Sequence, residues 1–379
     1  MPTYLKNNRS LTFYQQSSLR SKSIDATYSG GISSASISNV AFVTRTTANS
    51  YNAQLQNYLN KFNSLRAEDI LRYDLNTPNQ LARNMGVKRA WMYEKADIEM
   101  GGNGSAHWNA EEKAQIIDHD VVRGAEGHHL QNVADHPEQQ ANPDNIKFYK
   151  NREEHLQHGH NGSWDNESNK PMTDKNKMLE KTNTRRIIKN ELQGLGIAAA
   201  IGLGVGFSIG FITTLAQSGI APDSLKYAIM EGFKSGTESG IMSVISYSIG
   251  RVALQAISGA LENVGITLSE NGLKMLNIGV IGSLTTIVFS AYQFLKLKLK
   301  GVTTEEALIQ TGKQALFSLS LLAVSIAAQG IWGGSVGIIV SISIGIIMIT
   351  YSVIDTVYQR FFSEKIRIYT IEKCCPSFS

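Results

Sequence analysis

Histidine is confined to one stretch of the chain, where its spacing is suited to metal chemistry. All eight histidines lie between residues 107 and 160 of a 379-residue sequence, and His128 and His129 are adjacent. Neutral imidazole is a common protein ligand for zinc and also suits other divalent transition metals. Adjacent residues on a strand point to opposite faces, so one of this pair can bind a metal ion while the other faces a substrate.

A second group of histidines follows, with a spacing that could complete such a site. His155 and His158 are three residues apart, so on a helix they share one face and can chelate a single ion. His160 is the alternative to His158 as the last ligand. Three protein ligands with one open position are typical of a catalytic metal site, and an unligated histidine beside it is well placed as a general base. Between the two groups, Asn145 can hold a loop and orient that base through its side-chain amide.

These residues resemble a known nuclease motif. The order His-His, Asn, His-x-x-His is similar to that of HNH, or ββα-metal, nucleases. The local pattern GHH…P-x-NI…EHLxHG resembles the GHH-type HNH/endonuclease VII-like nucleases of bacterial toxins. The resemblance covers roughly residues 100–165. The chain departs from colicin-type domains, which use a pair four residues apart, and its two cysteines lie far away at Cys374 and Cys375.

The resemblance implies a role for each matching residue. His128 would be a metal ligand, and His129 would be the general base that deprotonates the attacking water. Asn145 would hold the loop and position His129. His155 and His158, or His160 in place of His158, would complete the site. The implied reaction is hydrolysis of phosphodiester bonds with one divalent ion, which could be magnesium, manganese, nickel or zinc.

Basic residues near the motif are the expected contacts to nucleic acid. Lys147, Lys150 and Arg152 follow the Asn145 segment, and seven further basic residues lie between residues 170 and 189. Such side chains contact phosphates and release counterions. The formal net charge of +4 is mild and does not by itself indicate a nucleic-acid-binding protein. The expected substrate is double-stranded DNA.

The second half of the chain is apolar enough to enter a membrane. Residues 1–190 carry 45 of the 68 charged side chains. Uncharged runs cover residues 194–216, 275–295 and 314–354, and a bilayer core is crossed by about 20 residues of helix. The longest run predicts a hairpin of two spans, 314–330 and 333–354. Within the first run, glycines recur every fourth residue from Gly202 to Gly210, a spacing that lets helices approach closely in lipid.

Charge also predicts an orientation for these spans. The basic clusters at 170–189, 296–300 and 360–367 should all be cytoplasmic by the positive-inside rule, and four spans satisfy all three. A fifth span would place the 296–300 cluster outside. Residues 219–270, which contain Arg251, are therefore expected to form an interfacial or re-entrant segment. A charge at the bilayer centre costs about 2.5–3.5 kcal/mol on insertion scales.

The expected architecture is an α+β ββα-metal nuclease domain followed by an all-α, multi-span membrane domain. Residues 1–55 are expected to be flexible, 56–165 to form a helical brace with the nuclease domain, 166–190 to be a basic linker, and 191–379 to form the membrane domain.

The expected function is that of a membrane-anchored, metal-dependent endonuclease. It would sit in the inner membrane of a bacterium with its nuclease domain in the cytoplasm, and defend the cell against phage or foreign DNA. Two alternatives remain open, an interbacterial toxin with a translocating half and a non-enzymatic pore or scaffold with a degenerate HNH domain. The expected partners are nucleic acid, the lipid bilayer, a second copy bound through the glycine-rich helices, and an immunity or regulatory protein.

Overall fold

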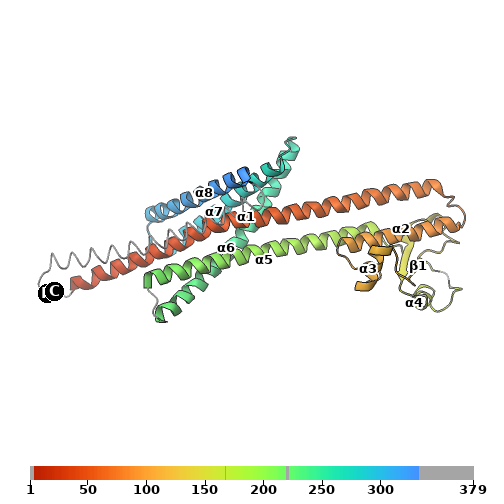
Figure 1. Cartoon of the computed structure of the whole chain (residues 1–379), viewed down its shortest axis with the longest axis horizontal. Helices are drawn as coiled ribbons and strands as arrows, with labels where there is room; N and C mark the ends of the chain where they lie inside the picture. The colour runs from red at the N-terminus through yellow and green to blue at the C-terminus, as the bar shows by residue number, and fades with distance from the viewer. Residues whose placement is uncertain (1–3, 167, 219–221, 333–379) are drawn as a thin grey trace. The chain divides into compact units, whose positions relative to one another are not determined.

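Helices make up most of the chain in a computed structural model of the protein (Figure 1). The structure describes residues 4–166, 168–218 and 222–332. Its helices and strands are α1 (Tyr4–Arg72), α2 (Gln80–Glu99), α3 (Ala110–His119), β1 (Glu126–His129), β2 (Ile146–Tyr149), α4 (Arg152–Glu154), α5 (Lys175–Ser218), α6 (Pro222–Asn263), α7 (Glu270–Leu299) and α8 (Thr304–Trp332). Three short turns are η1 (Pro137–Gln139), η2 (Pro143–Asn145) and the π-helical turn η3 (His155–Gly159).

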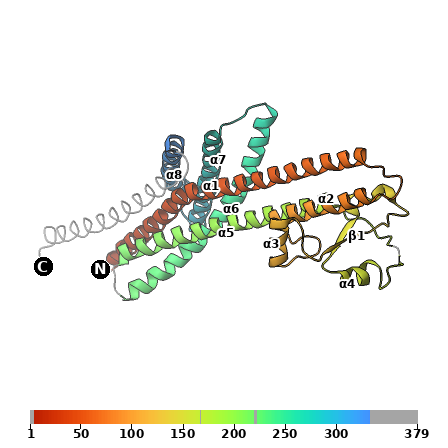
Figure 2. The same cartoon turned by 45° about the vertical axis from the view of Figure 1, so that its right-hand side comes forward.

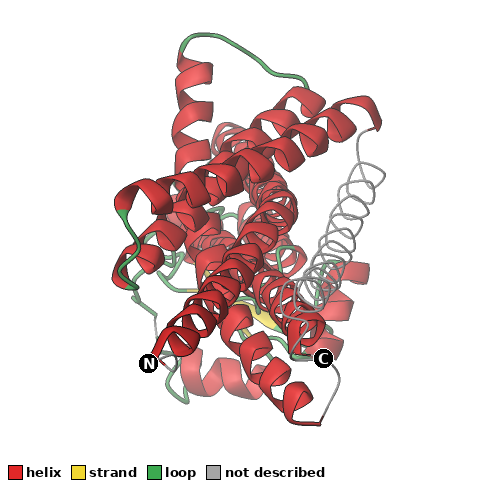
Figure 3. Cartoon of the chain, turned by 90° about the vertical axis from the view of Figure 1, so that its left-hand side faces the viewer, coloured by secondary structure: helices red, strands yellow, loops and turns green. Residues whose placement is uncertain are grey.

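The chain divides into two compact units, which are described separately. One unit is Thr46–Glu191, and the other combines Met1–Arg45 with Leu192–Ser379. Figure 3 shows the two short strands as the yellow segments among red helices. Both strands belong to the first unit, so an α+β domain precedes an all-α domain, and the predicted fold class is confirmed.

The first unit is built on a small antiparallel hairpin. In its register, His128 lies opposite Lys147 and His129 lies opposite Ile146. The turn η2 leads directly into β2, and α4 with η3 follows it, which gives the order strand, strand, helix. One apolar cluster supports the hairpin from α2 and α3 and contains Ala90, Trp91, Trp108, Ile116, Val122, Ile146 and Phe148.

A second apolar cluster joins three helices of the same unit. It contains Leu55 and Phe62 of α1, Tyr93, Ala96 and Met100 of α2, and Leu179 of α5. From Tyr4 onward, the region 1–55 that was predicted to be flexible belongs to one helix, α1. Its Ser- and Asn-rich composition is weakly helix-forming. Burial compensates for this, since Ile37 and Ala41 have no exposed surface and belong to the core of the other unit.

The predicted basic linker 166–190 also differs from the structure. Helix α5 begins at Lys175, and Lys175 and Leu179 are fully buried. The Lys175 ammonium lies 3.6 Å from a carboxylate oxygen of Glu94, and the Arg186 guanidinium donates to Tyr51 O at 2.7 Å. In this segment, Lys175 and Arg186 face partners within the unit, whereas Lys177, Lys181, Arg185 and Lys189 are exposed.

In the helical unit, glycines allow α5 and α6 to pack closely. A Cβ atom on Gly206 would lie 2.6 Å from the carbonyl oxygen of Ser235, and one on Gly210 would lie 2.7 Å from Ser235 Cβ. From the other side, a Cβ on Gly236 would lie 2.9 Å from Leu203 O. Helix α7 in turn lies against both α6 and α8 (Figures 1 and 2). The recurring glycines thus serve as a packing face.

Four described helices are long and apolar enough to cross a membrane. The candidate spans are Lys175–Leu215, Pro222–Asn263, Gly272–Leu299 and Thr304–Ala327. The second differs from the prediction for 219–270. Helix α6 is uninterrupted over 42 residues, whereas residues 219–270 were predicted to form an interfacial or re-entrant segment. The predicted span 333–354 and the basic cluster 360–367 lie outside the described residues.

The α5–α6 packing face makes the first prediction. Gly206→Leu should lower the thermal unfolding midpoint of the detergent-purified protein, because its side chain must displace α6. Overpacking costs about 1–3 kcal/mol. Gly204→Leu is the matched control, since a Cβ there meets nothing within 4 Å. Equal midpoints for the two variants would contradict this packing.

Candidate metal centre

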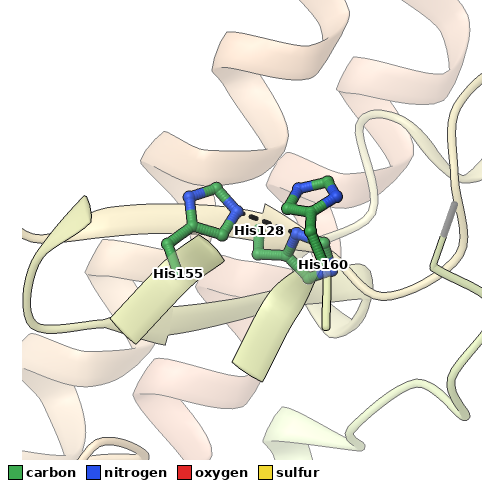
Figure 4. A group of neighbouring side chains, drawn as sticks. All are labelled: His128, His155 and His160. Atoms are coloured by element: carbon green, nitrogen blue, oxygen red, sulfur yellow. Dashed lines mark hydrogen bonds between the residues drawn. The ribbon is translucent and has the colours of Figure 1, made fainter. Parts of the chain in front are cut away.

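Three histidines from two segments of the sequence meet in the first unit. Donor nitrogens of His128, His155 and His160 all lie within 4.8 Å of one another (Figure 4). The closest pair is His128 Nδ1 and His155 Nε2, at 2.9 Å. The third ring completes the group, with its centroid 4.8 Å from that of His128 and 5.1 Å from that of His155.

Strand β1 separates the two adjacent histidines. His128 is 4 % exposed and turns toward the other histidines, whereas His129 is on the opposite face of the strand. The His129 ring contacts the Gln140 carbonyl oxygen, which lies 3.1 Å from Nε2. A carbonyl can only accept, so Nε2 carries the proton and Nδ1 holds the lone pair. Burial lowers the pKa of His129, which keeps this ring neutral and able to accept a proton.

The π-helical turn explains why His160 joins the group and His158 does not. In η3, hydrogen bonding of the π type brings residues five positions apart to the same side, and His155 and His160 have that spacing. His158 would share a face with His155 only on a regular α-helix, and its side chain is exposed. Gly159 is buried beneath the turn, where a Cβ would lie 2.7 Å from a carbon of the His155 ring.

Two of the three histidines have their outer nitrogen fixed by an acceptor. His155 Nδ1 donates to a carboxylate oxygen of Glu126 at 2.7 Å, and His160 Nδ1 donates to Asn166 O at 2.9 Å. Each bond leaves Nε2 as the nitrogen with a lone pair. Carboxylates and carbonyls commonly orient metal-binding histidines in this way.

His128 is the least satisfied member of the group. Its Nε2 atom is buried without a hydrogen-bond partner among the described residues. Burial, followed by the effects of His155 and His160, lowers the pKa of His128 to about 3. The ring is therefore neutral at physiological pH, which is the form that binds a metal.

The residues present fit a divalent transition metal. The imidazoles of His128, His155 and His160 place nitrogen atoms close enough to share one ion, and a further coordination position would remain open, as catalytic sites require. Among the four expected ions, imidazole donors suit zinc and nickel better than magnesium, which prefers oxygen ligands. His128, His155 and His160 would hold the ion.

Asn145 holds the end of the hairpin. It is completely buried, its Oδ1 accepts from Gln131 N at 2.7 Å, and its Nδ2 donates to Gln131 O at 3.0 Å. Its own carbonyl accepts from Leu130 N at 2.8 Å. The Asn145 side-chain amide therefore holds the backbone of Gln131, two residues after His129, and these hydrogen bonds do not involve the His129 ring.

The neighbouring Asp144 ties this turn to two helices of the unit. Its carboxylate accepts two bonds from Arg66 of α1, at 2.7 and 2.9 Å, and one from the backbone N–H of Lys175 at 2.9 Å. The last contact places a carboxylate at the N-terminus of α5, where the helix dipole favours negative charge. Sequence analysis gave Asp144 no role.

The three predicted phosphate contacts have different surroundings. The Lys150 ammonium is 2.9 Å from a carboxylate oxygen of Glu112, so its charge is already paired. Lys147 is exposed and lies over the Tyr149 ring at 5.1 Å. The Arg152 side chain is 75 % exposed. Lys147 and Arg152 are therefore more exposed than Lys150.

A comparison with protein families finds a match within this unit. Residues 79–150 match the model of a family described as GHH signature containing HNH/Endo VII superfamily nuclease toxin. This segment is similar to that nuclease family. The match confirms the resemblance for this part of the chain, and it includes His128, His129 and Asn145. No curated protein and no solved structure matches the chain.

Glu126 is a residue of this site that sequence analysis did not identify. It precedes His128 by two positions on β1, so the two side chains share one face of the strand. The spacing of two residues could have indicated Glu126 from the sequence, but only with the knowledge that residues 126–129 form a strand.

Glu126 makes the second prediction. Glu126→Ala should weaken zinc binding about 10- to 100-fold, because His155 loses the acceptor that orients it. Isothermal titration calorimetry of the full chain in detergent measures this directly. Glu153→Ala is the matched control, an exposed carboxylate on the same short helix as Arg152. Equal affinities for the two variants would contradict the role of Glu126.

Proposed function

We propose that the chain is a metal-dependent endonuclease tethered to a membrane. The observation that carries this proposal is the convergence of His128, His155 and His160. His128 lies within the residues that match the nuclease family, and the other two follow shortly after them. His129, which is adjacent to His128 in sequence and lies on the other face of β1, is the candidate for the general base of such a nuclease.

The proposed chemistry is hydrolysis of a phosphodiester bond. A divalent ion held by the three imidazoles would stabilise negative charge that develops on the phosphate and on the leaving oxygen. His129 Nδ1 accepts the proton of a water molecule as that water's oxygen bonds to phosphorus, and the bond to the leaving oxygen breaks. The bond from His129 Nε2 to Gln140 O keeps the base in the required tautomer. Asn145 fixes the backbone that follows it.

The proposed substrate is DNA. Lys147 and Arg152 are exposed near the site and supply phosphate contacts of the kind that make binding depend on salt. Lys150 instead supports the fold, because its ammonium already bonds to Glu112.

The proposed location is the inner membrane of a bacterium, with the nuclease unit in the cytoplasm. Four helices are long and apolar enough to span a bilayer. The basic residues in the first part of α5 precede its apolar part, and the positive-inside rule assigns that end to the cytoplasm. Tethering would raise the local concentration of the nuclease where foreign DNA enters.

A toxin role is the second candidate, and one observation favours it over defence. The family that matches residues 79–150 is described as a nuclease toxin. A toxin would need an immunity partner in the cell that makes it. Expression in a bacterial host separates the roles, since a toxin should stop growth without phage, whereas a defence nuclease should act when phage infects.

The histidine triad makes the third prediction. His160→Ala should reduce DNA cleavage by the full chain at least about 100-fold, because a metal ligand is lost. His158→Ala should retain activity, since that side chain is exposed and outside the triad. The assay compares zinc, nickel, manganese and magnesium on plasmid and linear DNA.

His129 supplies the fourth prediction. His129→Ala should abolish cleavage and leave zinc affinity within about threefold, because the base is removed and the ligands remain. Full activity of this variant would refute the assignment of the base. Absence of cleavage by the unaltered chain with all four metals would favour the non-enzymatic, degenerate HNH reading.

A further inference from the structure

An exposed tryptophan stands directly against the histidine triad. The Trp164 ring centroid lies 4.9 Å from that of His160 and 5.3 Å from that of His155. The indole meets the His155 ring edge-on, at 89°. Trp164 nevertheless remains 44 % exposed.

Trp164 differs from the other tryptophans whose side chains the structure describes. Trp91 and Trp108 are 7 % and 2 % exposed and pack with Phe148 in the apolar core of the unit. The Trp164 ring lies against His155, His160 and Arg152, none of which is an apolar core residue. Leaving a large aromatic surface in water is unfavourable, so hydrophobic packing does not explain this position.

A guanidinium group extends this aromatic surface. The Arg152 guanidinium carbon lies 4.7 Å from the Trp164 ring centroid, which is a cation–π distance. The nearest carboxylate oxygen, on Glu126, is 3.6 Å from Arg152, and 75 % of the arginine side chain is exposed. Charge and aromatic surface therefore face solvent together beside the triad.

We propose that Trp164 and Arg152 form a binding site for an unpaired nucleobase next to the phosphate that is cut. Trp164 stacks on the base, and Arg152 contacts the adjoining phosphate. The proposal rests on the proposed nuclease function, which it deepens by naming the substrate form. A base inside a duplex is stacked on its neighbours, so this site favours single-stranded DNA, frayed ends or flipped nucleotides over intact double strands.

The distances suit such a nucleotide. The Trp164 ring centroid lies 4.9 Å from that of His160 and 5.3 Å from that of His155. A nucleotide whose phosphate is held at the triad would therefore have its base close to Trp164. Stacking on an aromatic side chain tolerates any base, because every base offers a π-face. The site therefore selects unpaired DNA without selecting its sequence.

The test compares binding of two oligonucleotides. The full chain in detergent, carrying His129→Ala so that the probe stays intact, is titrated with single-stranded oligothymidine and with an abasic oligomer of the same length. The unaltered Trp164 should favour oligothymidine about tenfold, since stacking on an aromatic ring strengthens binding by roughly that factor or more. Trp164→Leu should abolish this preference, and Trp164→Phe should keep most of it.

Fluorescence supplies a second readout that does not depend on cleavage. Oligothymidine should quench the emission that Trp164 contributes, and the Trp164→Phe variant should show no such quenching. An equal preference for bases in the Trp164 and Trp164→Leu proteins would overturn the proposal, whether or not zinc affinity changes.

The two hypotheses can fail separately. If the chain with His129 restored cuts no DNA with any metal, the ratio of its affinities for oligothymidine and for the abasic oligomer still measures base binding at Trp164. If it cuts DNA but shows the same ratio in the Trp164 and Trp164→Leu proteins, the nuclease stands and the base site is refuted.

Discussion

His128 Nδ1 and His155 Nε2 face each other at 2.9 Å. The other ring nitrogen of His128, Nε2, is buried and has no hydrogen-bond partner among the described residues. Two imidazole nitrogens this close are joined either by a shared proton or by a shared cation. Burial keeps His128 neutral by lowering its pKa to about 3, so its lone pair is available. With His160 as a third donor, the group offers the kind of ligands that a divalent cation needs.

Several elements of the first unit bring the rings of His128, His155 and His160 together. The hairpin sends His128 to one face and His129 to the other, and the π-helical turn returns His160 to the side of His155. The Asn145 amide fixes the backbone between the two histidine groups, and its neighbour Asp144 is tied to α1 and α5 by charged bonds. These polar ties act together with the two apolar clusters of the unit.

The sequence predicted the fold class, the histidine group and the apolar helices, because each leaves a local pattern of residue type and spacing. It favoured His158 over His160, since periodicity assumes a regular helix and cannot anticipate a π turn. It missed Glu126, whose role needs the strand geometry, and it interpreted the segment around Leu179 as a linker. Helix α5 runs through that segment, and Leu179 packs with residues of α1 and α2 that lie far away in the sequence. Amino-acid composition does not reveal contacts between residues that lie far apart in the sequence.

The most direct test of the metal centre is an anomalous-difference map from crystals of the full chain grown with zinc. The account predicts one strong peak at about 2.0–2.1 Å from a nitrogen of each of His128, His155 and His160, with an open coordination position. A peak ligated by His158 in place of His160, or zinc bound only at other residues, would contradict it.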